Sequence, residues 1–235
     1  MSTQISKLMK NSFIKCLFIS LLFSTSVFAQ ESAVELFNAG NAAYGAKDYN
    51  TALTKWEAYL AHPDVAVEQV ESVTYKVADA ANRAKNTEKA RTYFQKCIDL
   101  GYKADISMFK LGTSYKTEDP AKYISIMETC VKEFPNSKYY KKYFLGSVVA
   151  YYNKAASEIF NKANAEVQTA AANTTTYVST MKSKVLPLFA QAEEAFNKTL
   201  SFDASNATAT NAIANINAQR ESLKAYEAQL AAQKK

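Results

Sequence analysis

Four small residues recur along the chain at a nearly constant spacing. Gly40, Ala78, Gly112 and Gly146 are separated by 38, 34 and 34 residues. Each stands in a stretch whose apolar residues recur every three or four positions, the period of an α-helix that buries one face. A helical unit of this length cannot bury its apolar face alone, so the recurrence predicts an array of stacked helical hairpins.

The first unit has the sequence pattern expected of a helical hairpin. Small residues around Gly40 lie on one helical face, and a turn follows at residues 45–49. Trp56 and Tyr59 then mark the apolar face of a second helix. The unit therefore reads as two helices joined by a tight turn and crossing at a small residue.

The third unit carries the most specific pattern. Its sequence Phe109-Lys-Leu-Gly-Thr-Ser-Tyr115 contains Leu-Gly-x-x-Tyr, and Pro135 closes the unit. Together with the period, these residues resemble the tetratricopeptide repeat (TPR), a pair of antiparallel helices of 34 residues. The resemblance implies an all-α fold, a right-handed solenoid of antiparallel helix pairs, with three repeats over residues 30–135.

The fourth unit departs from the repeat pattern. No turn signal follows Gly146 at the usual distance, and the first turn residues come at 173–176. We therefore predict one elongated helical hairpin over residues 136–206, in which Pro187 kinks or breaks the returning helix. Residues 207–235 are predicted to form a capping helix with a polar outer face, as the end of a solenoid requires.

The N-terminus has the pattern of a secretory signal peptide. Lys7, Lys10 and Lys15 precede a short apolar run that ends in Val27-Phe28-Ala29. The run is too short to span a bilayer stably, although a retained anchor helix is the alternative. We expect residues 1–29 to be removed and the chain to be exported, to the periplasm or outside the cell. The mature chain contains no further stretch that the sequence marks as transmembrane.

The charge of the mature chain is small. Removing residues 1–29 leaves 25 basic against 22 acidic residues, a net charge of +3. So weak an excess does not indicate a nucleic-acid partner. Seven lysines and two glutamates lie within residues 138–184. This segment is either a solvated helix face or a surface that binds an anionic polymer or a membrane.

Cys97 and Cys130 are the two cysteines of the mature chain, and we expect both to be free. They occupy matching places in the second helices of successive repeats. The axes of packed helices are on the order of 9 Å apart, which is beyond the reach of a disulfide. The sequence therefore predicts two buried thiols rather than a bridge.

No catalytic constellation is evident in the sequence. His62 is the only histidine, and there is neither a glycine-rich phosphate loop nor a cluster with metal-ligand spacing. We therefore predict no catalytic residue, no cofactor and no metal site. The chain reads as a scaffold rather than as an enzyme.

The residues expected to bind a partner follow from the TPR resemblance. The aromatic residues that stand three positions before each marker residue are Phe37, Tyr75, Phe109 and Tyr143. In the resembled fold this position faces the concave groove, where aromatic side chains suit a peptide or helix partner. The alternative is that these rings pack between neighbouring helices.

Two further rows of residues complete the predicted groove. The polar residues next along the face are Asn41, Asp79, Thr113 and Ser147, followed by Tyr44, Asn82 and Lys116. The resemblance implies an exported scaffold that binds a protein or peptide in this groove. The alternatives are a factor that binds an anionic polymer or membrane through residues 138–184, and a subunit of an envelope assembly complex. Nothing in the sequence specifies the partner or an oligomeric state.

Overall fold

The computed structural model describes residues 31–233, which form helices and turns without a strand. This confirms the predicted all-α class. The chain divides into two compact units, which meet between Val67 and Glu68. The boundary between the two units therefore lies after the first hairpin. The predicted signal peptide, residues 1–29, lies outside the described residues.

The first unit is one helical hairpin made of α2 (Ala33–Gly45) and α3 (Tyr49–Leu60). Ser32 caps α2 in a capping box with Glu35, which satisfies amides at the helix start. The two helices cross at Gly40, where an added β-carbon would lie 2.5 Å from the Trp56 ring. Only a residue without a side chain fits there, which explains the small residue at this position.

The second unit begins with two hairpins. The first consists of α4 (Val70–Arg83) and α5 (Thr87–Asp99), and the second of α6 (Ala104–Thr113) and α7 (Pro120–Glu133). Helices α5, α6 and α7 pack in sequence order. The α6–α7 crossing lies at Gly112, where an added β-carbon would meet Met127 Cε at 2.3 Å. Gly112 thus has the role that Gly40 has in the first unit.

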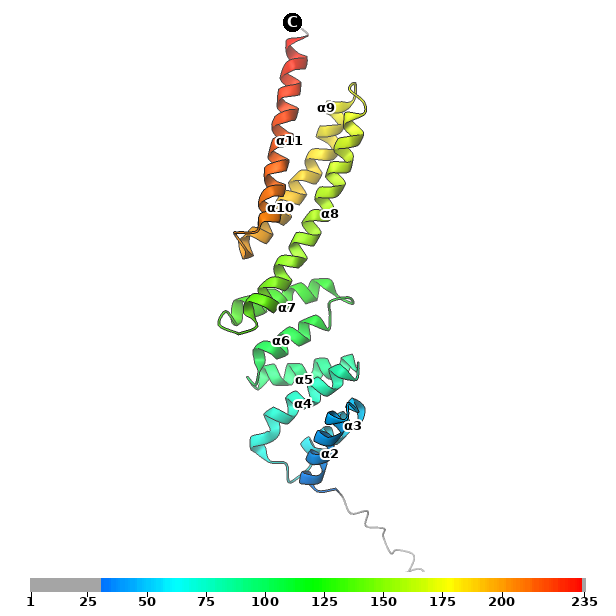
Figure 1. Ribbon diagram of the computed structural model, residues 1–235, viewed down its shortest axis with the longest axis vertical. Helices are drawn as coiled ribbons and strands as arrows, with labels where there is room; N and C mark the ends of the chain where they lie inside the picture. Colours follow the sequence, from blue (N-terminus) through cyan, green and yellow to red (C-terminus); the bar gives the residue numbers. More distant parts are fainter. Residues whose placement is uncertain (1–30, 234–235) are drawn as a thin grey trace, which may run out of the picture. The chain divides into compact units, whose positions relative to one another are not determined.

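A long helical hairpin follows the third repeat. It starts with the π-helix η2 (Tyr140–Leu145), which continues directly into α8 (Gly146–Ala171). After a short turn the chain returns through α9 (Tyr177–Thr180), the π-helix η3 (Met181–Val185) and α10 (Leu186–Phe202). Figure 1 shows α8 and α10 side by side, with α11 (Ala207–Ala232) along α10.

Pro187 does not end the returning helix. It lies in the first turn of α10, directly after the π-helix η3. A proline lacks an amide proton and crowds the preceding turn, so it disturbs the regular i→i+4 hydrogen bonds before it. The wider π turn accommodates this disturbance, and the helical path continues to Phe202.

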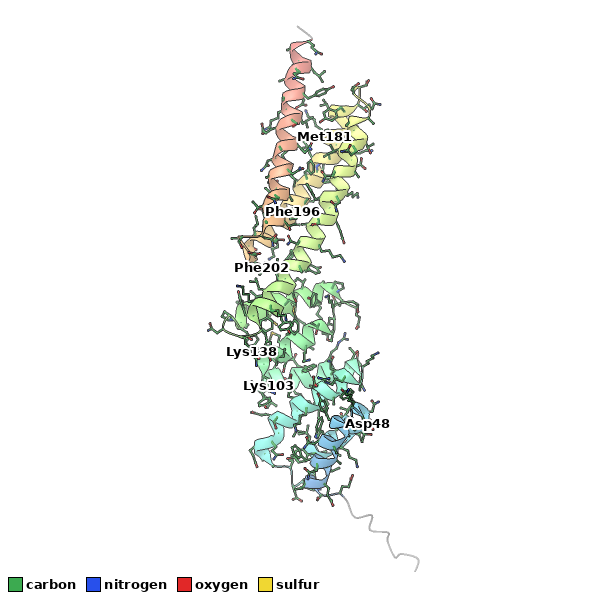
Figure 2. All side chains as sticks on the ribbon, in the orientation of Figure 1. Asp48, Lys103, Lys138, Met181, Phe196 and Phe202 are labelled. Atoms are coloured by element: carbon green, nitrogen blue, oxygen red, sulfur yellow. The ribbon has the colours of Figure 1, made fainter. Side chains whose placement is uncertain are left out.

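The core of the long hairpin is built from regularly spaced side chains. The residues that α8 contributes to this core are alanines seven positions apart, which lets the neighbouring helices approach closely. Larger side chains from η3, α10 and α11 fill the space, and Figure 2 labels two of them. The principal members of this core are Ala156, Ala163, Ala170, Met181, Phe189, Phe196, Ile216 and Leu223.

Both cysteines are free and buried, as the sequence predicts. Burial raises the pKa of Cys97 to about 11 and that of Cys130 to about 12. Each thiol therefore stays protonated and poorly nucleophilic at neutral pH. No helix within residues 31–233 is long and apolar enough to cross a membrane.

Candidate partner-binding site

The predicted binding residues of the first unit lie on α2. The Phe37 ring is half-buried and its centroid lies 5.4 Å from that of Tyr59 on α3. Tyr44 is likewise half-buried, with its ring 5.5 Å from Trp56. Asn41 is partly accessible between them. The two aromatic residues thus contribute to the α2–α3 contact as well as to the surface.

The predicted aromatic residues of the second unit also contact other rings. Tyr75 lies 6.2 Å from Phe94 between ring centroids. Phe109 lies 5.3 Å from Tyr143 and 5.9 Å from Phe144. Tyr143 keeps 38% of its surface exposed. Each of these side chains therefore takes part in packing, and Tyr143 offers the largest free surface.

The polar residues that the sequence places beside these rings already have internal contacts. Asp79 Oδ2 accepts a 2.7 Å hydrogen bond from Arg83 Nε, and its Oδ1 lies 3.6 Å from Lys110 Nζ. The Thr113 hydroxyl donates to the Lys110 carbonyl at 2.9 Å. Asn82 is exposed. These groups stabilise the fold locally, and only the exposed amide of Asn82 is wholly at the surface.

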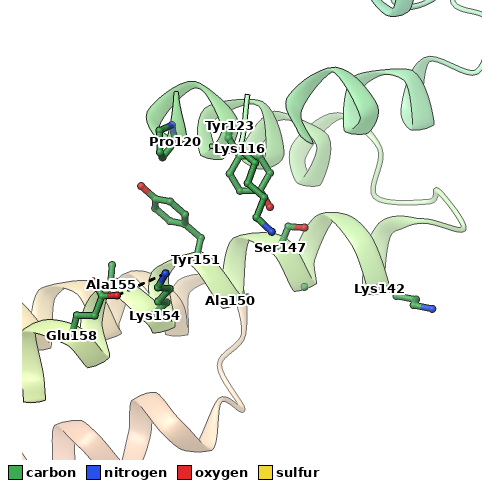
Figure 3. A pocket seen from close by; sticks show the side chains of 11 residues that line it. Lys116, Pro120, Tyr123, Lys142, Ser147, Ala150, Tyr151, Lys154, Ala155 and Glu158 are labelled. Atoms are coloured by element: carbon green, nitrogen blue, oxygen red, sulfur yellow. Dashed lines mark ion pairs between the residues drawn. The ribbon is translucent and has the colours of Figure 1, made fainter. Parts of the chain in front are cut away.

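Lys116 and Ser147 are brought together by a pocket between α7 and α8. The pocket has a volume of about 690 Å³, within the range of small-ligand and peptide-anchor sites. Figure 3 shows Lys116 reaching from the α6–α7 turn toward α8, which carries Ser147. We call this the lysine pocket, and its lining residues are Lys116, Pro120, Tyr123, Lys142, Gly146, Ser147, Ala150, Tyr151, Lys154, Ala155 and Glu158.

The length of α8 creates the lysine pocket. Gly146, Ser147, Tyr151, Ala155 and Glu158 recur along one face of α8 over more than three turns. The opposing wall is shorter, because α7 begins at Pro120 after the α6–α7 turn. Helix α8 therefore continues past the start of α7 and leaves a hollow between them.

An aromatic floor and a basic rim define the chemistry of the lysine pocket. Tyr123 is buried, and its ring lies 6.4 Å from that of Tyr151. Lys154 pairs with Glu158 at 3.9 Å, which leaves the charges of Lys116 and Lys142 uncompensated by the lining. Figure 3 shows Lys142 at the far end of the pocket, pointing away. Such a surface suits a ligand with a carboxylate and an apolar side chain.

Several residues of the lysine pocket were not among the predicted binding residues. Tyr151, Lys154 and Glu158 lie on the part of α8 that has no counterpart in a regular repeat. The uninterrupted apolar stripe after Gly146 indicates that this helix extends beyond its neighbours. The bulky Tyr123, at a position where the repeat usually has a small residue, indicates an altered helix crossing at α7.

The matches to known proteins agree with the helical hairpins. A family model described as Tetratricopeptide repeat matches residues 73–100 and 107–137. These two segments of the chain are similar to tetratricopeptide repeats. They cover most of the α4–α5 and α6–α7 hairpins of the second unit. This fold is typical of scaffolds for protein interactions and of proteins without enzyme activity.

Two solved structures are similar to this chain. A TPR repeats protein from Bacteroides fragilis has 16% identity and a TM-score of 0.54, over 81% of this chain and all of the other. At this identity the likeness shows a shared fold only. A Bacteroides ovatus protein has 12% identity and a TM-score of 0.43, over 82% of this chain and all of the other. The search of curated proteins found no match to this chain.

Proposed function

We propose that this protein is a non-enzymatic scaffold that binds an acidic segment of a protein partner in the lysine pocket. The observation that carries the proposal is the charge of Lys116, which no carboxylate of the lining pairs, in a pocket that also holds the Tyr151 ring. A partner carboxylate can pair with Lys116 while a neighbouring apolar side chain lies on the tyrosine. The hydroxyl groups of the half-buried Ser147 and Tyr151 line the pocket and can bond the partner's backbone.

The electrostatics favour a modest, salt-sensitive interaction. Lys116 is exposed, so it pairs with a partner carboxylate in a largely aqueous environment. Such pairs orient the partner and speed its association more than they add to the affinity. The Tyr151 ring and the apolar part of the pocket must then supply much of the binding free energy.

The alternative of a polymer- or membrane-binding surface within residues 138–184 gains no support from the lysine positions. Lys154, Lys182 and Lys184 form ion pairs with carboxylates of the chain. The seven lysines are spread over the turn before η2, η2 itself, α8 and η3 rather than gathered on one helix. We therefore place the partner in the lysine pocket.

Export belongs to the same proposal. The basic start, the short apolar run and the Val27-Phe28-Ala29 sequence support removal of residues 1–29 and delivery to the periplasm. In that compartment free thiols meet oxidants, and the burial of Cys97 and Cys130 would protect them.

The proposal is tested by affinity capture with a matched charge reversal. The mature chain and its Lys116→Glu variant are immobilised and exposed to the same envelope extract, and the retained proteins are identified by mass spectrometry. We expect at least one acidic protein to be retained by the wild type and depleted on the variant. Equal retention of every captured protein by both would contradict the proposal. Circular dichroism checks that the variant is folded.

A further inference from the structure

We infer that the protein has a second docking site, an apolar trough along α6 between α5 and α7 that accepts an acidic amphipathic helix. The trough shares no lining residue with the lysine pocket. The protein would then bridge two partners. The apolar trough is lined by Arg91, Thr92, Gln95, Ile98, Met108, Leu111, Tyr115, Lys122, Ile126 and Thr129.

The geometry of the apolar trough follows from helical spacing. Met108, Leu111 and Tyr115 are three and four residues apart and form its floor from α6 and the turn after it. Ile98 of α5 and Ile126 of α7 stand on the two walls. The residues predicted to face the concave groove, such as Phe109 and Thr113, point to a different side of α6 because they fall at other helical positions.

The size of the apolar trough matches a short helical segment. Its volume is about 430 Å³, enough for a few large apolar side chains. The floor from Met108 to Tyr115 spans about 10 Å at roughly 1.5 Å per residue. This distance corresponds to about two helical turns. An amphipathic helix with apolar residues at i, i+3 or i+4 and i+7 presents side chains over the same length.

Charge distinguishes one end of the apolar trough from the other. The Tyr115 ring lies between two cations, with Arg91 Cζ at 3.8 Å and Lys122 Nζ at 4.0 Å from its centroid. Arg91 is held by Glu118 at 2.6 Å and by the Ser114 carbonyl at 2.8 Å. No carboxylate within residues 31–233 forms an ion pair with Lys122, whose charge acts on Glu118 at longer range, and the lining of the trough contains two cations and no carboxylate.

The opposite end of the apolar trough is neutral. Gln95, Ile98 and Thr129 line it, and Asp99, the acidic residue nearest in sequence to Ile98, accepts a hydrogen bond from Gln95. A partner helix therefore gains most from a carboxylate at the end that meets Lys122, next to its apolar residues. This complementarity selects an acidic amphipathic helix over a basic one.

Lys122 offers a variant that should not disturb folding. Its backbone amide donates to the Asp119 side chain, the N-cap of α7, at 2.9 Å. A glutamate at this third helical position suits the capping box and the helix dipole. Lys122→Glu therefore reverses the charge at the trough while keeping the start of α7 intact. Lys116→Glu makes the same charge change in the lysine pocket and is the matched control.

The test is a selection from a random peptide display library on the mature wild-type protein. We expect enriched peptides that combine Asp or Glu with apolar residues at i, i+3 or i+4 and i+7. Such peptides should bind Lys122→Glu about fivefold to tenfold more weakly, as replacement of an attractive charge by a repulsive one at an exposed rim implies. Their binding to Lys116→Glu should stay within about twofold of the wild type. Replacing their apolar residues by alanine should abolish binding.

Three results would overturn the second site. They are the absence of any enriched peptide, enriched peptides that bind wild type and Lys122→Glu alike, and enriched peptides weakened by Lys116→Glu alone. The last result would place the acidic segment in the lysine pocket only. Partner capture by the Lys116→Glu variant tests the lysine pocket and does not involve the apolar trough. Each of the two proposed sites can therefore be refuted without the other.

Discussion

The Tyr152 hydroxyl donates a 2.9 Å hydrogen bond to Glu128 Oε1 and so joins α8 to α7. Lys198 of α10 reaches the same carboxylate oxygen at 3.1 Å. The Tyr152 ring is stacked on Phe202, with centroids 6.1 Å apart and planes 8° from parallel. One cluster therefore connects the third repeat to both long helices of the hairpin that forms the wall of the lysine pocket.

Removing the Tyr152 hydroxyl should weaken this connection. Tyr152→Phe deletes one hydrogen bond to a charged acceptor and leaves the ring stack intact. We expect the free energy of unfolding to fall by about 1–2 kcal/mol, measured by urea denaturation. Tyr151→Phe is the control, because the Tyr151 hydroxyl lines the lysine pocket and forms no hydrogen bond within the described residues. Equal free energies of unfolding for the two variants would show that the hydrogen bond from Tyr152 to Glu128 does not stabilise the fold.

Stability should decrease at alkaline pH because of the buried thiols. Burial raises the pKa of Cys97 from 9.0 to about 11 and that of Cys130 from 9.0 to about 12. A group with a raised pKa in the folded state stabilises the fold below its unfolded pKa, and this stabilisation is lost as pH rises from there through the folded pKa. The free energy of unfolding, measured from pH 8 upward, should therefore fall above about pH 9. A Cys97→Ala/Cys130→Ala variant should lose less stability over the same range, and an identical slope would refute the assignment.

Two glycines should respond oppositely to alanine. At Gly112 a β-carbon would lie 2.3 Å from Met127 Cε and 2.9 Å from Ile126 Cγ2, so Gly112→Ala should cost about 1–3 kcal/mol through overpacking. At Gly146 the nearest atom is the Lys141 carbonyl oxygen at 3.6 Å. Gly146→Ala should therefore raise stability by up to about 1 kcal/mol through helix propensity. The melting temperatures of both variants test this prediction. A stabilising Gly112→Ala substitution would show that the α6–α7 crossing is looser than described.

The turn between α4 and α5 holds a lysine in a conformation that suits glycine. Lys85 has φ of 59°, in the left-handed region, and Asn86 after it caps α5. Replacing Lys85 by glycine removes the steric cost of the β-carbon, about 1 kcal/mol. We expect Lys85→Gly to raise the melting temperature slightly. The control Lys89→Gly, inside α5, should lower the melting temperature by a similar amount. A lower melting temperature for both variants would indicate that the turn at Lys85 is not strained.

The repeat fold could be predicted because close helix crossings require small residues at regular positions in the sequence. Gly40 faces Trp56 and Gly112 faces Met127 at distances that admit no β-carbon, so small residues recur at the repeat period. The same logic explains the departure at Gly146, which has no such neighbour. The π-helices η2 and η3 were not predictable, because the choice between α and π turns depends on packing and on the position of Pro187.

The candidate site was predictable only in part. Lys116 and Ser147 were identified from their register in the repeat, and both line the lysine pocket. Lys154 and Glu158 could not be identified, because their place in the pocket depends on how α8 passes α7 in space. The register also could not show that Phe109 contacts Tyr143 and Phe144, since ring packing is set by rotamers of side chains far apart in sequence.

The most direct test of the lysine pocket is a charge swap between Lys116 and the acidic residue of a captured partner. The affinity is measured for the wild-type pair, for Lys116→Glu with the wild-type partner, for a partner Glu→Lys variant with wild-type protein, and for the two variants together. We predict that each single change weakens binding about fivefold or more and that the double change restores most of the loss. If the double variant binds as weakly as the two single effects combined, the acidic segment does not lie in the lysine pocket.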